Sequence, residues 1–205
     1  MSLIKISSSK KIKNDTIVKN DDIKLSVSLI IESKLQTKIW RQKQQWYKNG
    51  KSNECEIYQR QLIEEITNLK CNKTNQRINM VNLEITNKSN PLHDNDGFEW
   101  SEDFDGLIVE KNINYLFNLK FICGQGGSQT RSLREVYHFI KSQLDLLLKN
   151  KNNNTYFINI LDGDICFKNM DKFNYLLDKK EYINVKKYLF ISDMYNFKKF
   201  WNMIK

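Results

Sequence analysis

The chain has 205 residues, which is enough for one well-buried domain and leaves little for a second. Its 33 Lys and Arg outnumber 24 Asp and Glu, giving a net charge of +9 that favours a polyanion such as nucleic acid, although a coding bias towards Lys, Asn and Ile would give the same balance. No apolar run is long enough to span a membrane and the polar N-terminus lacks a signal-peptide core, so we expect a soluble intracellular protein, in the cytoplasm or nucleus of a host cell, with no membrane partner.

Residues 1–24 form a polar, basic segment rich in Lys, Ser, Asn and Asp. Such a segment is typical of a loosely attached arm, and a basic arm that contacts phosphate is the alternative. We expect residues 25–205 to form a single domain. Apolar residues alternate over 25–31, which predicts a strand, while Ile39, Trp40 and Trp46 could lie along a helix.

A turn is expected over 48–53, followed by an amphipathic helix over 54–70 with Tyr58, Leu62, Ile66 and Leu69 on one face. The aromatic residues of this part of the chain could stack on bases, but helical spacing favours a place in the core. The pattern over 71–98 is ambiguous between helix and strand, and the only proline of the chain marks a break there.

Beyond the break, strands and helices alternate. The order of these elements predicts an α/β fold of the α+β kind, in which a mixed central sheet is flanked by helices. The expected strands are 106–110, 115–123, 156–161 and 186–191, and the expected helices are 129–149, 168–177 and a C-terminal helix that Asp193 caps.

The four cysteines, Cys55, Cys71, Cys123 and Cys166, lie far apart in the sequence and form no Cys-x-x-Cys pair. This spacing argues against a zinc site or a disulfide framework. Reduced, buried thiols are the favoured interpretation.

Two polar residues interrupt the hydrophobic segment 115–123. Residues two apart on a strand share a face, so Asn118 and Lys120 project together while Phe117, Leu119 and Phe121 face the other way. A glycine loop, Gly-Gln-Gly-Gly-Ser at 124–128, and a polar-faced helix follow directly.

The succession of Asp105-Gly106, a hairpin, Asn118-Leu119-Lys120, the glycine loop, a helix with Tyr137 and Ile140, and the strand ending in Leu-Asp-Gly-Asp resembles the catalytic core of PD-(D/E)xK nucleases. Within that superfamily it is most similar to type II restriction endonucleases. The resemblance covers about residues 100–195 and implies a restriction endonuclease-like core.

Phosphodiester hydrolysis needs a divalent cation to neutralise charge and to acidify a water, and a second cation near the attacking oxygen. The resemblance implies that Asp105 binds Mg²⁺ or Mn²⁺, that the carbonyl of Leu119 is a further metal ligand, and that Lys120 is the catalytic lysine. Asn118 stands where the family has Asp or Glu. An amide oxygen can ligate Mg²⁺ but brings no charge.

A replacement carboxylate could come from Glu135 on the following helix, which we include among the candidate catalytic residues with Asp105, Asn118 and Lys120. Glu99 or Glu102 could serve instead. Gln129, Arg131 and Arg134, at the start of that helix, are candidate DNA-binding residues, because arginines and helix N-termini suit phosphate. A solvated helix face with paired arginines is the alternative.

The leading hypothesis is therefore a metal-dependent endonuclease that hydrolyses double-stranded DNA, with a homodimer as a possible assembly by analogy with restriction enzymes. The alternative is a catalytically inactive nucleic-acid-binding or structural protein that retains the nuclease fold. A small interaction protein that is basic only by coding bias is a third possibility. Asp162 and Asp164 are expected to cap the next helix, or else to border the cleft.

Overall fold

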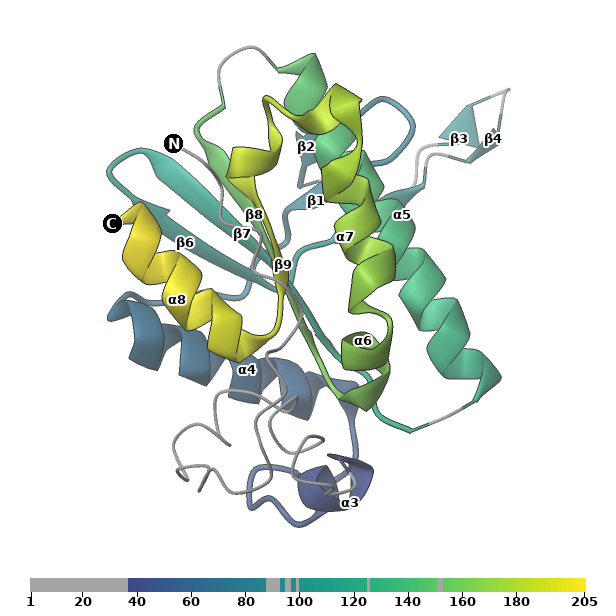
Figure 1. Cartoon of the computed structure of the whole chain (residues 1–205), viewed down its shortest axis with the longest axis vertical. Coiled ribbons are helices and arrows are strands. Elements are labelled where there is room, and N and C mark those ends of the chain that lie inside the picture. The colour runs from purple at the N-terminus through teal and green to yellow at the C-terminus, as the bar shows by residue number, and fades with distance from the viewer. Residues whose placement is uncertain (1–36, 88–92, 95–96, 99, 125, 151–152) are drawn as a thin grey trace.

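The computed structural model describes residues 37–87, 93–94, 97–98, 100–124, 126–150 and 153–205 (Figure 1). The basic segment 1–24 and the strand expected over 25–31 lie outside the described residues. The order of elements confirms a mixed α/β fold. A four-stranded sheet forms the centre of the molecule, in the order β6-β7-β8-β9.

In the central sheet, β6 and β7 form an antiparallel hairpin, and β8 and β9 extend it in parallel. Lys111 and Asn112 close the hairpin with φ values of 49° and 67°, the left-handed conformations that a tight hairpin turn requires. A smaller antiparallel sheet, in the order β2-β1-β5, and the short β3-β4 pair precede it in sequence. The strands are β1 (Arg77–Asn79), β2 (Glu84–Thr86), β3 (His93–Asp94), β4 (Gly97–Phe98), β5 (Ser101–Asp103), β6 (Gly106–Glu110), β7 (Ile113–Phe121), β8 (Thr155–Asp162) and β9 (Leu189–Ser192).

Helices cover both faces of the central sheet (Figure 1). α5, α6 and α7 lie on one face, and α4 and α8 lie on the other. Helix α8 begins as predicted, because the side chain of Asp193 accepts a hydrogen bond from Asn196 N at 2.8 Å. The helices are α3 (Thr37–Gln42), α4 (Ser52–Thr67), α5 (Gly127–Lys149), α6 (Asp164–Lys168), α7 (Met170–Asp178) and α8 (Met194–Ile204), with 3₁₀ turns η1 (Lys180–Tyr182) and η2 (Lys186–Tyr188).

The strand expected over 186–191 starts later than predicted. β9 pairs with β8 only from Leu189 onwards, and the residues before it form η2. The expected helix 54–70 is α4, and the expected helix 129–149 begins two residues earlier, at Gly127. Trp46 lies beyond α3 rather than in it, and its ring stacks on Tyr58 of α4 at 4.3 Å between centroids.

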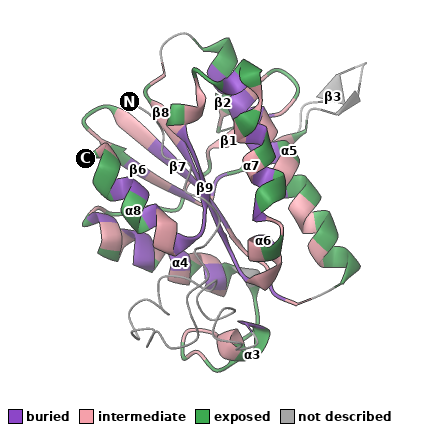
Figure 2. Ribbon diagram, in the orientation of Figure 1, coloured by how far each residue is buried: buried purple, intermediate pink, exposed green. Residues whose placement is uncertain are grey.

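Two apolar clusters fill the space on either side of the sheet, and the inner strands are buried along most of their length (Figure 2). One cluster joins the sheet to α5 and α7 and includes Leu116, Phe139 and Phe157. The other joins the sheet to α4 and α8 and includes Phe117 and Trp201. Successive residues of β7 therefore alternate between the two clusters, as period-two alternation predicts.

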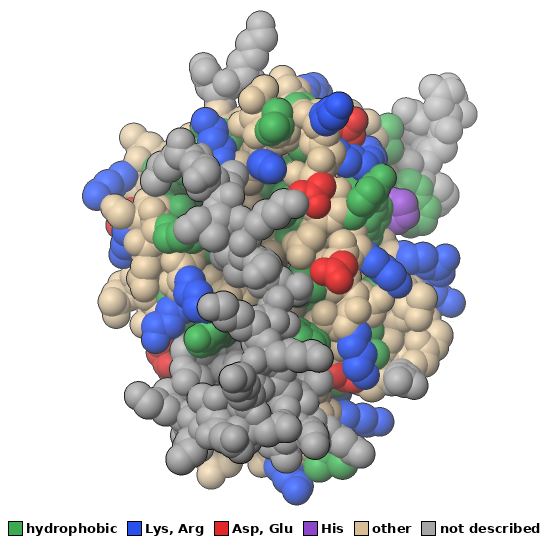
Figure 3. All heavy atoms as spheres, in the orientation of Figure 1, with side chains coloured by type: hydrophobic (Ala, Val, Ile, Leu, Met, Phe, Trp, Pro, Cys, Tyr) green, Lys and Arg blue, Asp and Glu red, His purple; other side chains and the backbone are tan. Residues whose placement is uncertain are grey.

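All four cysteines are buried and none forms a disulfide, in agreement with the prediction. None of the described helices combines the length and the apolar character needed to cross a bilayer. On the face shown in Figure 3, Lys and Arg side chains are spread over both sides of the described surface.

Candidate functional site

Asp105 and Lys120 meet where the β6–β7 ladder ends. Gly106, the first residue of β6, pairs with Phe117 at the open end of the hairpin, and Asp105 N donates a hydrogen bond to Phe117 O at 2.8 Å. Two residues further along β7, the Asp105 side chain takes the place of the missing strand, because its Oδ2 accepts the Leu119 N–H at 2.7 Å. Lys120 Nζ lies 3.9 Å from the same oxygen. The two groups therefore lie on the same side of the sheet.

The carbonyl of Leu119 points to the same edge. The N–H and C=O of one residue in an antiparallel pair face the same neighbouring strand. Because the Leu119 N–H faces Asp105, its carbonyl oxygen also faces the side that β6 has vacated. The described residues form no hydrogen bond to the other carboxylate oxygen of Asp105, Oδ1, which leaves it available to a ligand.

Asn118 is fully buried, with 0% of its surface exposed. Its Nδ2 donates to Oδ1 of Asn159, the residue beside it on β8, at 2.8 Å. Asn159 and Gln143 of α5 complete a buried amide network through hydrogen bonds of 2.7 and 3.1 Å. This network fixes the orientation of the Asn118 amide, with its nitrogen towards β8.

The Oδ1 atom of Asn118 is buried and receives no hydrogen bond from the described residues. Buried polar atoms are normally hydrogen-bonded, so an unpartnered one needs a reason. Since the amide nitrogen points to β8, the oxygen points away from that strand, and Asp105 stands on the other side of β7. Asn118 thus has a structural role through its nitrogen and leaves one oxygen without a partner.

Acidic groups surround Lys120. Burial raises the pKa of Asp105, and the Lys120 ammonium and the Leu119 N–H partly oppose that rise. Burial likewise raises the pKa of Glu102 on β5, where Lys120 acts to lower it and Asp103, Glu135 and Asp105 act to raise it further. Carboxylates from β5 and α5 are therefore close enough to Lys120 and Asp105 to share one electrostatic environment, which favours a cation.

The oxygen atoms at this site fit a hard divalent cation better than a soft one. Among the described ranges, no three Asp, Glu, His or Cys side chains already form a metal-binding group. The available donors are instead one carboxylate, Asp105, and two neutral oxygens, those of Asn118 and Leu119. Mg²⁺ commonly uses one or two carboxylates and keeps several waters, so this donor set is compatible with it.

Helix α4 holds the backbone on both sides of the site, a role that no pattern in the sequence indicates. Arg60 Nη1 donates to Asp105 O at 2.9 Å, and Gln59 Nε2 donates to Lys120 O at 3.3 Å. These contacts join residues 45 and 61 positions apart, so no local pattern could have predicted them. They hold the backbone of the Asp105 turn and the end of β7 against one helix.

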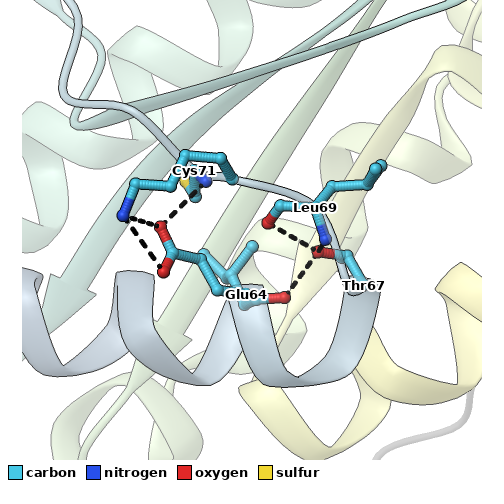
Figure 4. Close-up of polar contacts among 6 residues, drawn as sticks. Glu64, Thr67, Leu69 and Cys71 are labelled. Carbon is cyan, nitrogen blue, oxygen red and sulfur yellow. Dashed lines mark hydrogen bonds and ion pairs between the residues drawn. The ribbon is translucent and has the colours of Figure 1, made fainter.

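The end of α4 also fixes the chain beneath Gly106. Glu64 accepts the Cys71 N–H at 3.1 Å and pairs with Lys70 at 3.0 Å, while Thr67 Oγ1 accepts the Leu69 N–H at 3.2 Å (Figure 4). The Cys71 sulfur consequently lies so close to Gly106 that an added Cβ would sit 2.8 Å from it. Glycine after Asp105 is therefore required by close packing rather than by an unusual φ.

The polar residues of α5 lie on different sides of the helix. Gln129 and Arg134 line a pocket between α5 and helices α6 and α7, whereas Arg131 is exposed and does not line it. Successive helical residues are rotated by about 100°, so Glu135 points well away from the side of Arg134. Glu135 is exposed, and the side on which it lies is the one electrostatically linked to Glu102.

Asp162 and Asp164 have structural partners, but they do not cap the next helix as expected. Asp162 accepts hydrogen bonds from Met194 N at 3.2 Å and from Gln59 Nε2 at 2.8 Å, so it supports the start of α8. Asp164 accepts the Gly124 N–H at 2.9 Å and thereby fixes the glycine loop. α6 begins without a side-chain cap.

No protein-family model matches the chain, and neither a curated protein nor a solved structure is significantly similar to it. The candidate site is therefore interpreted from its own geometry.

Proposed function

We propose that the chain is a metal-dependent endonuclease that hydrolyses DNA phosphodiester bonds and has a restriction endonuclease-like core. The observation that carries the proposal is the position of Lys120 Nζ, 3.9 Å from Asp105 Oδ2 at the open end of the β6–β7 ladder. An acid and an ammonium on one face, beside free oxygen atoms, are the groups that metal-assisted hydrolysis requires.

Asp105 Oδ1, the Leu119 carbonyl and Asn118 Oδ1 would hold the cation, Mg²⁺ or Mn²⁺. A bound divalent cation supplies charge neutralisation and lowers the pKa of a water. Lys120 orients the attacking oxygen and stabilises its negative charge. Glu102 and Glu135, which are electrostatically linked to this site, would supply the negative charge that Asn118 lacks.

Double-stranded DNA is the proposed substrate, and the basic excess of the chain supports it, because phosphate neutralisation dominates DNA affinity. Arg131, on the exposed ridge of α5, would contact the phosphate backbone. A homodimer would bring one such site to each strand.

The test is incubation of supercoiled plasmid with purified protein and Mg²⁺ or Mn²⁺. We expect nicked and linear products. Lys120→Ala should reduce the rate by roughly 10²- to 10⁴-fold, the usual contribution of a positioned proton-transfer or charge-stabilising group. Asp105→Asn should reduce it to background.

Two exposed residues of the α4–α8 face provide matched controls. Lys198→Ala on α8 and Glu65→Gln on α4 remove the same kinds of charge and should leave cleavage unchanged. Equal cleavage by wild type and Asp105→Asn, with both folded by circular dichroism, would reject the site.

A catalytically inactive DNA-binding protein is the second candidate, and the neutral amide at position 118 favours it. Asn118→Asp separates the two. The variant replaces a donor to Asn159 with an acceptor, so we expect it to lose about 1–3 kcal/mol of unfolding free energy. If the wild-type protein only binds DNA, cleavage should appear in this variant; if it is an endonuclease, the variant should require less metal.

A further inference from the structure

A pocket of about 700 Å³ is lined by residues of the first half of α5 and of helices α6 and α7, on the other side of α5 from Glu135. Leu133, Ile165 and Phe173 give it an apolar floor. Tyr137 and Tyr175 contribute aromatic rings to its wall, and Tyr175 is 62% exposed. An exposed ring beside an apolar floor offers a planar ligand a surface on which to stack.

Two cations stand at the rim of this pocket. Arg134 and Lys172 both line it and are exposed, and neither side chain pairs with another described residue. One carboxylate, Asp171, also lines it, so the rim keeps a net positive charge. Unpaired cations at the edge of an aromatic pocket suit a ligand that joins a ring to a phosphate.

We infer that this pocket binds a single nucleotide, with its base against Tyr175 and the apolar floor and its phosphate against Arg134 and Lys172. The volume is in the range of about 300–1,000 Å³ typical of small-molecule sites. Gln129 and Asn169 are amide side chains of the lining that can pair with base edges, and Asp171 can accept from an exocyclic amine or a sugar hydroxyl.

The position of the pocket relates it to the proposed site of cleavage. Arg134 and Glu135 are neighbours on α5 but point to different sides, and the exposed residues Arg131 and His138 occupy the ridge between those sides. A DNA strand crossing this ridge would meet Lys120 on one side and place an unstacked nucleotide in the pocket on the other. In this respect the inference rests on the proposed function, although nucleotide binding itself requires no cleavage.

The experiment is a titration of the ¹⁵N-labelled protein with each of the four deoxynucleoside monophosphates, without metal, followed by NMR. We expect amide shifts at Leu133, Tyr137 and Phe173. Tyr175→Ala should weaken the affinity by about 5-fold or more, because stacking on one aromatic ring contributes about 1–3 kcal/mol per base. Arg134→Ala and Lys172→Ala should each weaken it, while Lys198→Ala, which removes an exposed cation of α8 outside the pocket, should not.

Deoxyribose 5-phosphate and inorganic phosphate are the control ligands. If they bind as tightly as the nucleotides, the pocket is only an anion site and the inference is overturned. Shifts confined to Asp105 and Lys120, or no binding at millimolar concentrations, would overturn it as well. Tyr175 is a surface residue of α7, so its variant should fold, which unchanged far-UV circular dichroism would verify.

The two proposals can fail separately. The titration uses no metal and no cleavable substrate, and Asp105→Asn should bind nucleotides like the wild type. Nucleotide binding without plasmid cleavage would support the pocket and reject the nuclease. Cleavage without nucleotide binding would do the reverse.

Discussion

Asp105 directly precedes β6 and Asp162 ends β8, the two strands that flank β7, and burial raises the pKa of both. Asp105 has an ammonium 3.9 Å away, and its side chain is 15% exposed. Asp162 is 3% exposed, donors from α4 and α8 occupy both of its oxygens, and its charged neighbour is a second acid, Asp193. The carboxyl group of Asp105 is therefore beside a cation and partly exposed, whereas that of Asp162 is enclosed.

This contrast shows that a raised carboxyl pKa does not by itself mark a reactive site. At Asp162, the neighbouring acid and the lack of solvent favour the neutral form, so the residue contributes to packing at the start of α8. At Asp105, burial also raises the pKa, but the Lys120 ammonium and the Leu119 N–H favour the charged form, and the exposed part of the side chain leaves room for a ligand. The charge of the nearest titratable neighbour distinguishes the two aspartates: it is a lysine at Asp105 and a second aspartate at Asp162.

The largest expected effect on stability concerns the close packing next to Asp162. Gly163 follows Asp162 with φ of 101°, and an added Cβ would lie 2.1 Å from Ile122 O. Gly163→Ala should therefore cost roughly 3 kcal/mol or more of unfolding free energy, through strain and collision with backbone. Gly127→Ala, where a Cβ meets nothing within 4 Å, is the control and should be neutral in urea unfolding. Similar stability of the two variants would show that the backbone around Gly163 and Ile122 is not closely packed.

A smaller effect follows from the pKa of Asp162, which burial and Asp193 raise from 3.8 to about 7. A raised folded-state pKa favours folding while the group is neutral, so this contribution is full below pH 4 and lost as the pH rises through 7. In Asp162→Asn the loss is absent, so its stability relative to wild type should rise over that interval, by at most about 4 kcal/mol.

Urea unfolding at a series of pH values measures this difference, with the exposed Asp171→Asn as the control. A constant difference between Asp162→Asn and wild type from pH 4 to 8 would contradict the enclosed, neutral state of Asp162 that its pKa near 7 implies.

The smallest effect concerns Arg60, whose side chain donates a hydrogen bond to the backbone of Asp105. Arg60→Ala removes the hydrogen bond to Asp105 O and should cost about 1 kcal/mol of stability. Because the backbone of the Asp105 turn then loses an anchor, we expect metal affinity to fall about 10-fold, as for other residues that orient a ligand. Titration with Mn²⁺ measures it. Arg60→Lys, which keeps a donor, should restore part of the affinity.

Much of the fold could be predicted from local patterns. The three- and four-residue steps of α5 reflect burial on one face of the helix, and Asp193 is a recognisable cap. The alternation around Asn118 indicates a strand, but both faces of that strand are buried. The start of β9 was predicted too early because Lys186 and Tyr188 read as strand residues, while pairing with β8 is possible only from Leu189. Where a strand begins depends on the neighbouring strand with which it pairs, so the sequence of residues 186–191 alone does not determine it.

The site was only partly predictable. The resemblance to nucleases singles out Asp105 and Lys120, and the structure brings their side chains to 3.9 Å of each other. The roles of Arg60 and Gln59 depend on contacts between distant segments. The fixed amide of Asn118 depends on Asn159 and Gln143, which nothing in the local sequence connects to it.

Mn²⁺ binding, followed by electron paramagnetic resonance in wild type, Asp105→Asn and Asp162→Asn, tests the metal site most directly. We predict that wild type and Asp162→Asn bind one ion with similar affinity, and that Asp105→Asn binds it more than about 100-fold more weakly, since losing a ligand should cost more than losing a residue that orients one. Equal binding by Asp105→Asn and wild type would contradict the assignment.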